Sequence, residues 1–573
     1  MRRLIYIFII GLLLCSYTWA DGSRYASKSL LSEGKWVKIR VDKTGIYKLS
    51  YADLKNMGFS DPSKVSVHGY GGWPLDEDFS KEYIDDVPST PVWRGSDYLL
   101  FYGKGSVKWE YDSSSQTFVH TNNPYCLYGY YFVTDATPTN DMTSVAQASG
   151  ASTRITTYDD YLLHEQELVS VNQSGREFFG EDFSGARPRT ISTFSSIPGI
   201  TDADGKVTMR FISRINSGSG TASLSINDSE LLDITIPSIQ TVSSNVRSYT
   251  KAIPGTTTAL WKGSKSEKNN VVVSYSSSGH TNVRLDYIRM QFVRTLRPYG
   301  ACTFFRSLTS VGNASRFVIS EANSNTLVFD VTDALNVKRV EADLNGSELS
   351  FTIPAGRLRE FVLVQTNQTF PSPEVVGEVA SSNLHGLEQR DMIIISAPSL
   401  VQQAERLAVA HREKDGLTVE VVTPEAIYNE FSSGTPDATA YRRLMKMFYD
   451  RSSSLGNPPK YLLLFGDGIY DNRGISGEVQ GVSRSNMLLT FQSQESLNVY
   501  SYATDDYFAF LEDISGSNFS RDKMCLGVGR FPIRTVTEAT QMVDKTISYM
   551  ENKDSGSWQI SLLRPLKRCN PVF

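Results

Sequence analysis

The stretch YLLLF, from Tyr461 to Phe465, is apolar along its whole length. A short apolar run of this kind is typical of a strand that is buried on both faces, as at the centre of a parallel sheet. The run from Met392 to Ile395 has the same character. Between the two runs, apolar side chains recur at helical spacing from Ser399 to His411 and from Ala438 to Tyr449. Strands that alternate with amphipathic helices predict a three-layer α/β domain with a parallel sheet.

Two more strands and a helix extend this predicted domain. Leu417 to Val422 reads as a strand that follows the helix stop at Asp415-Gly416. Met524 to Gly529 reads as a fourth strand, and Thr537 is the expected N-cap of the next helix. Beyond Trp558 no periodicity remains, so we expect an incomplete sheet.

The region from about residue 30 to 380 alternates apolar and polar residues with period two, which is typical of strands with one buried face. Trp36 to Val41 partly follows this pattern, and Thr44-Gly45 then turns the chain into Ile46 to Leu49, which predicts a hairpin. Further segments with strand character are Tyr98 to Tyr102, Leu127 to Val133, Val207 to Ile212, Val271 to Tyr275 and Val283 to Phe292. We therefore expect β-rich, sandwich-like modules before the α/β domain.

The first twenty residues have the pattern of a cleavable secretory signal peptide. Arg2 and Arg3 precede an apolar stretch from Leu4 to Leu14, and small residues flank a cut before Asp21. A lipid anchor on Cys15 is the alternative, but Leu14 stands where lipoprotein processing needs a small side chain. We expect an exported protein, at the cell surface, associated with the outer membrane or in the periplasm.

The predicted organisation is a signal peptide over 1–20, β-rich modules over 21–200 and 201–385, the α/β domain over 388–559 and an aberrant tail over 560–573. A net charge of −5 over 573 residues does not favour nucleic acid as a partner. The sequence contains no second stretch of about 18 apolar residues, so no transmembrane span is predicted after signal cleavage. The mature cysteines show no CxxC spacing, so neither a disulfide framework nor a zinc site is predicted.

Four carboxylates follow predicted strands of the α/β domain: Asp467, Asp471, Asp505 and Asp506. Open α/β sheets bind ligands at the carboxyl ends of their strands, and calcium prefers oxygen ligands. These aspartates are therefore candidate calcium ligands, while helix capping and turn formation explain them equally well.

Several segments resemble known proteins. The α/β segments are Tyr461 to Asp467, Thr504 to Phe508 and Gly527 to Pro532, and those of the β region are Trp36 to Leu49, Gly175 to Glu181 and Leu285 to Ile288. The α/β segments resemble the gingipain-type cysteine peptidases, peptidase family C25. The whole chain is most similar to one branch, the surface sortase or C-terminal signal peptidase of the type IX secretion system.

This resemblance implies a caspase-like sheet on which a cysteine thiolate attacks a peptide carbonyl and a histidine acts as its acid/base partner. In the family both residues follow the segment that corresponds to 524–552, and this chain ends before reaching them. The resemblance leaves Asp522 as the candidate acidic residue that orients the histidine. Cys525 in a predicted strand and Cys569 in the tail are not expected to be nucleophiles. Gingipain-like domains often carry calcium, so the resemblance also implies this cofactor for the four aspartates.

The implied function is removal of C-terminal sorting domains from exported proteins and transfer of the acyl-enzyme to an anchoring acceptor. Because the catalytic pair is absent from the sequence, we expect a truncated chain that is inactive as given. The alternative is a non-catalytic cell-envelope component that binds other proteins of the secretion machinery.

Overall fold

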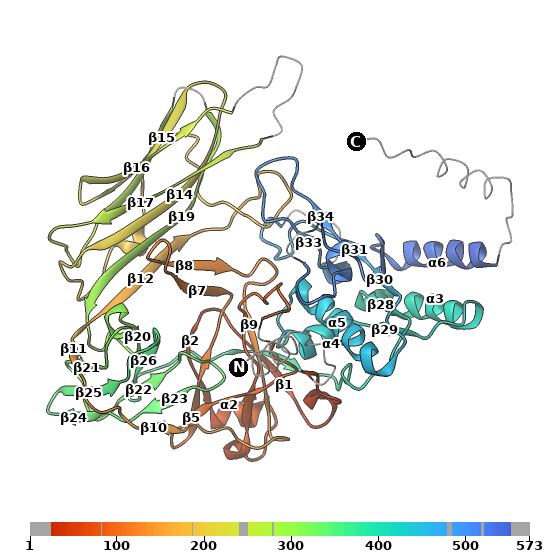
Figure 1. The fold of residues 1–573 in the computed structure, drawn as a ribbon, viewed down its shortest axis with the longest axis horizontal. Helices are drawn as coiled ribbons and strands as arrows, with labels where there is room; N and C mark the ends of the chain where they lie inside the picture. The colour runs from red at the N-terminus through yellow and green to blue at the C-terminus, as the bar shows by residue number, and fades with distance from the viewer. Residues whose placement is uncertain are drawn as a thin grey trace, which may run out of the picture.

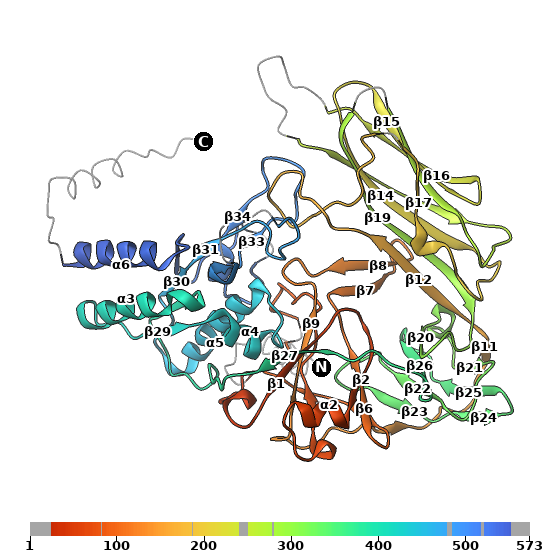
Figure 2. The same cartoon turned by 180° about the vertical axis from the view of Figure 1, so that it is seen from behind.

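The computed structural model describes residues 24–551, apart from 82, 186, 240–249, 278–279, 478–483, 517–518 and 520. The predicted signal peptide, Cys15, Cys569 and the tail over 560–573 lie outside the described residues. Figures 1 and 2 show β modules on one side of the molecule and a smaller α/β domain on the other. This arrangement confirms the predicted fold class, a multidomain chain with a β-rich region followed by an α/β domain.

The first β module contains the beginning of the described chain and one strand from much later in it. One sheet has the order β27-β1-β9-β3-β4 and the other the order β2-β6-β5. Its strands are β1 (Val37–Val41), β2 (Gly45–Ser50), β3 (Ser66–His68), β4 (Ser89–Thr90), β5 (Val92–Arg94), β6 (Tyr98–Gly103), β9 (Gly129–Thr134) and β27 (Glu374–Glu378). Helix α2 (Tyr51–Asn56) belongs to this module, and β7 (Val107–Asp112) and β8 (Thr117–Asn122) form a separate two-stranded hairpin.

The predicted hairpin between β1 and β2 is wrong. β1 pairs with β9 and β27, whereas β2 pairs with β6 in the other sheet. Ile39 of β1 and Tyr47 of β2 nevertheless pack into the same core. The turn at Thr44-Gly45 thus carries the chain from one sheet of the sandwich to the facing one, because side chains of both strands must be buried between the sheets.

The second and third β modules are each built from two sheets around one core. The second contains β12 (Thr157–Glu165), β19 (His280–Thr295), β14 (Gly205–Ile215) and β17 (Ile253–Trp261), facing β13 (Arg189–Thr190), β18 (Val271–Ser277), β15 (Ser219–Ile226) and β16 (Ser229–Pro237). The third contains β10 (Ser144–Val145), β23 (Lys338–Val340), β22 (Thr326–Asp330), β26 (Phe361–Gln365) and β20 (Cys302–Phe305), facing β11 (Thr153–Ile155), β21 (Ser315–Ile319), β25 (Glu348–Ile353) and β24 (Asp343–Asn345).

The α/β domain contains a four-stranded sheet of order β29-β28-β30-β35 in which every pairing is parallel. Helices α3 and α6 pack together on one side of these strands, and α4 and α5 lie on the other (Figure 1). The elements are β28 (Met392–Ser396), α3 (Val401–Lys414), β29 (Val419–Val422), α4 (Pro424–Phe431), α5 (Ala438–Leu455), β30 (Tyr461–Phe465), β35 (Gly527–Phe531) and α6 (Val536–Met550). The three-layer prediction is thus confirmed.

Two predicted boundaries of the α/β domain need correction. β35 begins at Gly527, so Cys525 precedes the strand, and its backbone N–H donates to the Ala509 carbonyl at 2.8 Å. The N-cap of α6 is Thr535 and not Thr537. Thr535 accepts a hydrogen bond from the Glu538 N–H, and the Glu538 carboxylate accepts one from the Thr535 N–H. This reciprocal capping box satisfies two backbone donors that a cap at Thr537 would leave unpaired.

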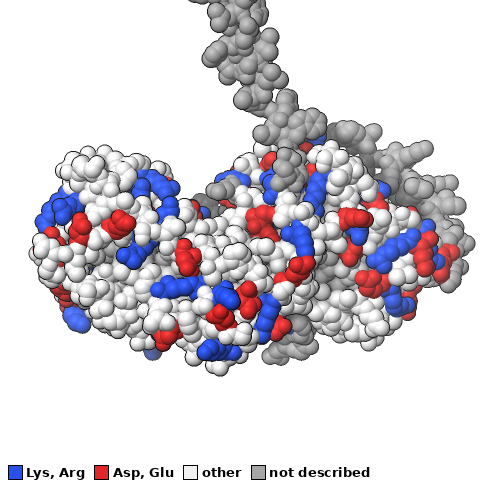
Figure 3. Space-filling model, turned by 90° about the horizontal axis from the view of Figure 1, so that it is seen from below, with Lys and Arg blue, Asp and Glu red and all other residues white. Residues whose placement is uncertain are grey.

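Acidic and basic side chains are intermixed on the face seen from below (Figure 3). This distribution agrees with the small net charge of the chain. Among the described helices none is both long and apolar enough to span a bilayer.

Candidate functional site at the carboxyl edge of the parallel sheet

The carboxyl ends of β28, β30 and β35 meet at one edge of the α/β sheet. Backbone hydrogen bonds tie them together there: the Ala397 N–H donates to the Phe465 carbonyl at 3.1 Å, and the Asp467 N–H donates to the Ile533 carbonyl at 3.0 Å. The loop from residue 466 onward leaves the sheet at this point. Ligands of open α/β sheets bind at this edge, which makes it the candidate site.

Three of the four predicted aspartates are paired with arginine, and the pair of Asp471 with Arg484 is the longest, at 3.9 Å. Asp467 forms an ion pair with Arg534, which follows β35. Asp505 accepts two hydrogen bonds from Arg530, at 2.9 and 2.8 Å. The Arg530 guanidinium also donates to the Gly466 carbonyl at 3.2 Å and so joins the Asp505 segment to the end of β30. In this arrangement guanidinium groups neutralise the Asp467 and Asp505 carboxylates.

Asp471 and Asp506 lie in loops outside the parallel sheet. Asp471 is fully buried and accepts hydrogen bonds from the backbone N–H groups of Gly474, Ile475 and Ser476. Burial acts to raise the pKa of Asp471, but the hydrogen bonds from Ser476 and Ile475 lower it overall. Asp506 begins a 3₁₀ turn after β34 (Ala503–Thr504), and β34 is an antiparallel strand outside the parallel sheet.

These four carboxylates do not converge on a shared metal position. Within the described parts of the chain, no group of three or more His, Cys, Asp or Glu side chains is arranged to hold a metal ion. Calcium binding by these four aspartates stays a prediction.

Asp522, the candidate orienting acid, lies in the loop before β35. Its Oδ2 accepts a hydrogen bond from the Gly516 N–H at 2.6 Å. The described histidines that form ion pairs do so with other carboxylates, namely His120 with Glu165, His164 with Glu181, His385 with Asp85 and Glu430, and His411 with Asp415. A role for Asp522 in catalysis also stays a prediction.

The three described cysteines are free thiols. Burial raises the pKa of Cys126 and raises that of Cys302 to about 12, so both thiols stay protonated at neutral pH. Cys525 is partly exposed, and its thiol faces the Lys523 carbonyl. In the described residues no hydrogen bond links a cysteine to a histidine.

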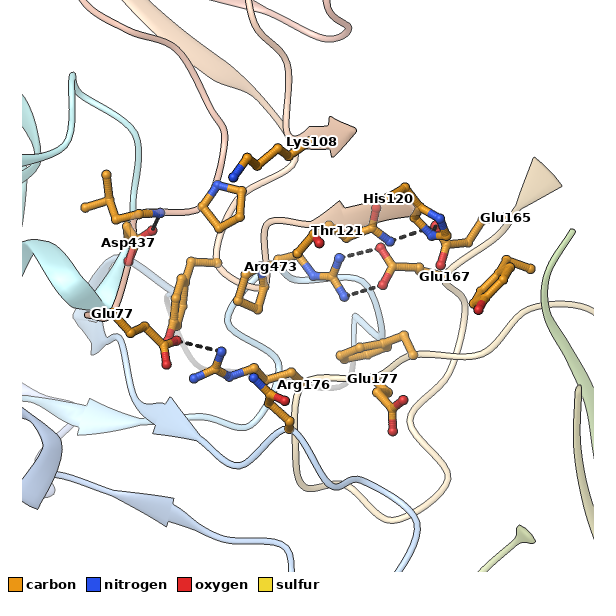
Figure 4. A pocket seen from close by; sticks show the side chains of 18 of the residues that line it. Glu77, Lys108, His120, Thr121, Glu165, Glu167, Arg176, Glu177, Asp437 and Arg473 are labelled. Carbon is orange, nitrogen blue, oxygen red and sulfur yellow. Dashed lines mark hydrogen bonds and ion pairs between the residues drawn. The ribbon is translucent and has the colours of Figure 1, made fainter. Parts of the chain in front are cut away.

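A cleft of about 740 Å³ lies between the first β module, the second β module and the loops of the α/β domain (Figure 4). Ion pairs cross it: Arg473 of the loop after β30 binds Glu167, and Arg176 binds Glu77 at 2.7 Å. Arg210 of β14 binds both Glu177, at 2.6 Å, and Asp286 of β19.

Two lining carboxylates are poorly stabilised as anions. Burial raises the pKa of Asp286 to about 7; Arg210 opposes this effect, while the charges of Glu165 and Glu177 add to it. Burial also raises the pKa of Asp437, the N-cap of α5, to about 6.

Sequence reasoning missed this cleft. Its lining residues come from widely separated segments whose meeting depends on the packing of the modules. One signal was present, since the segments Gly175 to Glu181 and Leu285 to Ile288 both carry the family resemblance and both contribute residues to the lining.

The comparisons with known proteins agree with this architecture. The model of peptidase family C25 matches residues 385–564. The crystal structure of dimeric latent PorU from Porphyromonas gingivalis is 38% identical with a TM-score of 0.85, and the match covers 94% of this chain and 51% of that one. This chain thus spans about half the length of that relative.

A second solved structure, the C-terminal CBM6 of LamC from Zobellia galactanivorans, is 15% identical with a TM-score of 0.13 over 23% of this chain and 98% of that one. That likeness is too weak to carry an argument. No curated protein matches the chain. The family model covers the α/β domain and the likeness to PorU extends over the β modules, so the chain belongs to peptidase family C25, the gingipain-type cysteine peptidases.

Proposed function

We propose that this chain is part of a cysteine peptidase of the type IX secretion system, which removes C-terminal sorting domains from exported proteins. The observation that carries the proposal is the match to PorU, which extends over 94% of the chain at 38% identity and includes the β modules as well as the α/β domain. Likeness over so much of the chain is more specific than a shared peptidase fold, because it includes modules that a generic C25 domain does not need.

The reaction proposed for the whole protein is acyl transfer. A cysteine thiolate attacks the carbonyl carbon of the scissile peptide, and a histidine protonates the leaving amine. Water or the amine of an anchoring acceptor then attacks the thioester, which releases the substrate and restores the thiol. We place the reacting carbonyl at the carboxyl edge of β28, β30 and β35 by analogy with other open α/β sheets.

We further propose that the polypeptide of 573 residues does not cleave peptides alone. Among the described residues no hydrogen bond links a cysteine to a histidine, and burial keeps Cys126 and Cys302 protonated. The second candidate function, a non-catalytic envelope component that binds secreted proteins, rests on the same observation. In either case we propose export to the cell surface, the outer membrane or the periplasm, with other secretion-system proteins as partners.

Cleavage and binding separate these functions. The mature chain would be mixed with a reporter protein fused to a C-terminal sorting domain from the same bacterium, and the products followed by intact mass spectrometry and sedimentation. Binding without cleavage is the expected result. Cleavage that survives simultaneous replacement of Cys126, Cys302 and Cys525 by alanine would exclude all three as nucleophile. If the sorting domain neither binds nor is cleaved, the secretion function itself is wrong for this chain.

A further inference from the structure

The cleft between the β modules and the α/β domain has features of a binding site. It is lined by segments of the first and second β modules, and Asp437, Arg473 and Gln494 contribute from the α/β domain. Asp437 caps the N-terminus of α5, and Arg473 lies in the loop that leaves the carboxyl end of β30. The cleft therefore opens on the same side of the α/β sheet as the candidate catalytic edge.

The lining carries an excess of negative charge. Eight carboxylates line it against five lysines and arginines: Asp76, Glu77, Glu110, Glu165, Glu167, Glu177, Asp286 and Asp437 face Lys81, Lys108, Arg176, Arg210 and Arg473. Burial is the main cause of the raised pKa of Asp286, and the charges of Glu165 and Glu177 add to it. A bound cation would favour the charged form of this carboxyl group.

The lining also has hydrogen-bond acceptors without partners. Glu165 Oε2 lies 2.8 Å from Asn122 Nδ2 and 3.2 Å from His120 Nε2. The second polar atom of each of these two side chains, Asn122 Oδ1 and His120 Nδ1, is buried and has no hydrogen-bond partner. The same holds for the Tyr125 hydroxyl. With the proton on Nε2, where it faces Glu165, Nδ1 is an acceptor. The His120 side chain is 5% exposed, so bulk water does not satisfy it.

Size and geometry indicate the kind of cation. In the described lining the carboxylates do not form a cluster that could hold a metal ion. The volume of about 740 Å³ accommodates several side chains of an extended peptide. Lysine and arginine side chains supply positive charge and N–H donors together, which matches an acidic lining with unused acceptors.

We propose that this cleft binds a basic polypeptide segment, whose lysine or arginine side chains contact the wall formed by Glu165, Glu177 and Asp286. The proposal rests on the proposed function in one respect, namely that the protein handles polypeptides. It adds a binding site on the same side of the sheet as the carboxyl ends of the strands, at which part of a substrate would be held while its scissile bond lies at the edge itself.

The test is fluorescence anisotropy of a labelled acetyl-(Gly-Lys)₄-amide peptide titrated with the mature full chain at low ionic strength. Glu177→Gln removes a half-buried wall carboxylate and should raise the Kd about three- to fivefold. Lys108→Met removes a competing positive charge from the lining and should lower the Kd by a similar factor. Unfolding of a variant cannot explain shifts of opposite sign.

Controls give each outcome a meaning. Glu341→Gln removes the same charge from an exposed position outside the cleft and should leave the Kd unchanged, and acetyl-(Gly-Glu)₄-amide should not bind. Failure of the lysine peptide to bind, or equal shifts from Glu341→Gln and Glu177→Gln, would overturn the proposal. The readout is binding, so a chain without peptidase activity leaves this test intact, and cleavage of a sorting domain without lysine-peptide binding would refute only the cleft.

Discussion

Arg473 binds the Glu167 carboxylate across the boundary between the α/β domain and the segment that follows β12, with Nη2 2.7 Å from Oε1. The Arg473 side chain is 2% exposed and that of Glu167 is 18% exposed. A buried charge that loses its partner is strongly destabilising, whereas exposed pairs contribute little.

Arg473→Ala should therefore lower the free energy of unfolding by about 3 kcal/mol, because it leaves Glu167 without its partner inside the boundary. Urea unfolding followed by tryptophan fluorescence measures this change. The matched control is Arg154→Ala, which breaks the exposed pair with Glu348 and should cost under about 1 kcal/mol. Equal losses for the two variants would show that the buried pair does not join the domains.

His385 should make stability depend on pH in the alkaline range. Burial acts to lower the pKa of His385, but hydrogen bonds and charges from Asp85 and Glu430 raise it to about 9, above the ordinary value of 6.5. This group therefore stabilises the fold fully below pH 6.5, and the contribution, at most about 3 kcal/mol, is lost as pH rises from 6.5 through 9.

Melting temperatures between pH 6 and 10 test the role of His385. The wild type should lose stability over this range more steeply than His385→Gln, which has no titrating ring between the two carboxylates. Parallel curves for the two proteins would assign the alkaline loss to other groups.

The capping box predicts different effects for two neighbouring threonines. Thr535→Ala should destabilise the chain by about 1 kcal/mol, because the Glu538 N–H loses its acceptor. Thr537→Ala, within the first turn of α6, should change stability by less than about 0.5 kcal/mol. Chemical denaturation of both variants measures the two losses in the free energy of unfolding. A larger loss for Thr537→Ala than for Thr535→Ala would show that Thr537 is the N-cap after all.

The described thiols should differ in reactivity. Alkylation needs the thiolate, and burial raises the pKa of Cys302 to about 12 and that of Cys126 above its ordinary value. Cys302 and Cys525 are both partly exposed, so the raised pKa of Cys302 should make iodoacetamide at pH 8 modify it at least about tenfold more slowly than Cys525. Peptide mapping by mass spectrometry gives the rates, and faster labelling of Cys302 would mean that its surroundings open in solution.

The strongest sequence predictions concerned elements whose pattern has one explanation. The run from Tyr461 to Phe465 became β30 with those boundaries, because a continuous apolar run must be covered on both faces, and all of its residues but Tyr461 are buried. The β1–β2 hairpin failed because a period-two pattern says which residues are buried but not which strand lies alongside.

The candidate site was only partly predictable for a related reason. The sequence placed Asp467 at the end of a strand, but its pairing with Arg534 depends on β30 and β35 being neighbours across more than sixty residues. The cleft was not predictable, since Glu165, Arg210 and Arg473 meet only when separate domains pack together. Side-chain chemistry is visible in a sequence, whereas the juxtaposition of remote segments follows from the fold.

The pairing of β27 with β1 sets an order for folding of the growing chain. Residues 374–378 close the edge of a sheet that begins at Val37, more than three hundred residues earlier. During synthesis from the N-terminus, the backbone groups of Ile39 and its neighbours along that edge therefore have no strand partner until the other two modules have emerged. A polypeptide with such a late closure gains its full stability only after nearly all β strands are present, and an exposed strand edge until then is a site for misassociation. A holding chaperone that occupies this edge would thus matter more for the first module than for the α/β domain, whose paired strands are separated by far fewer residues.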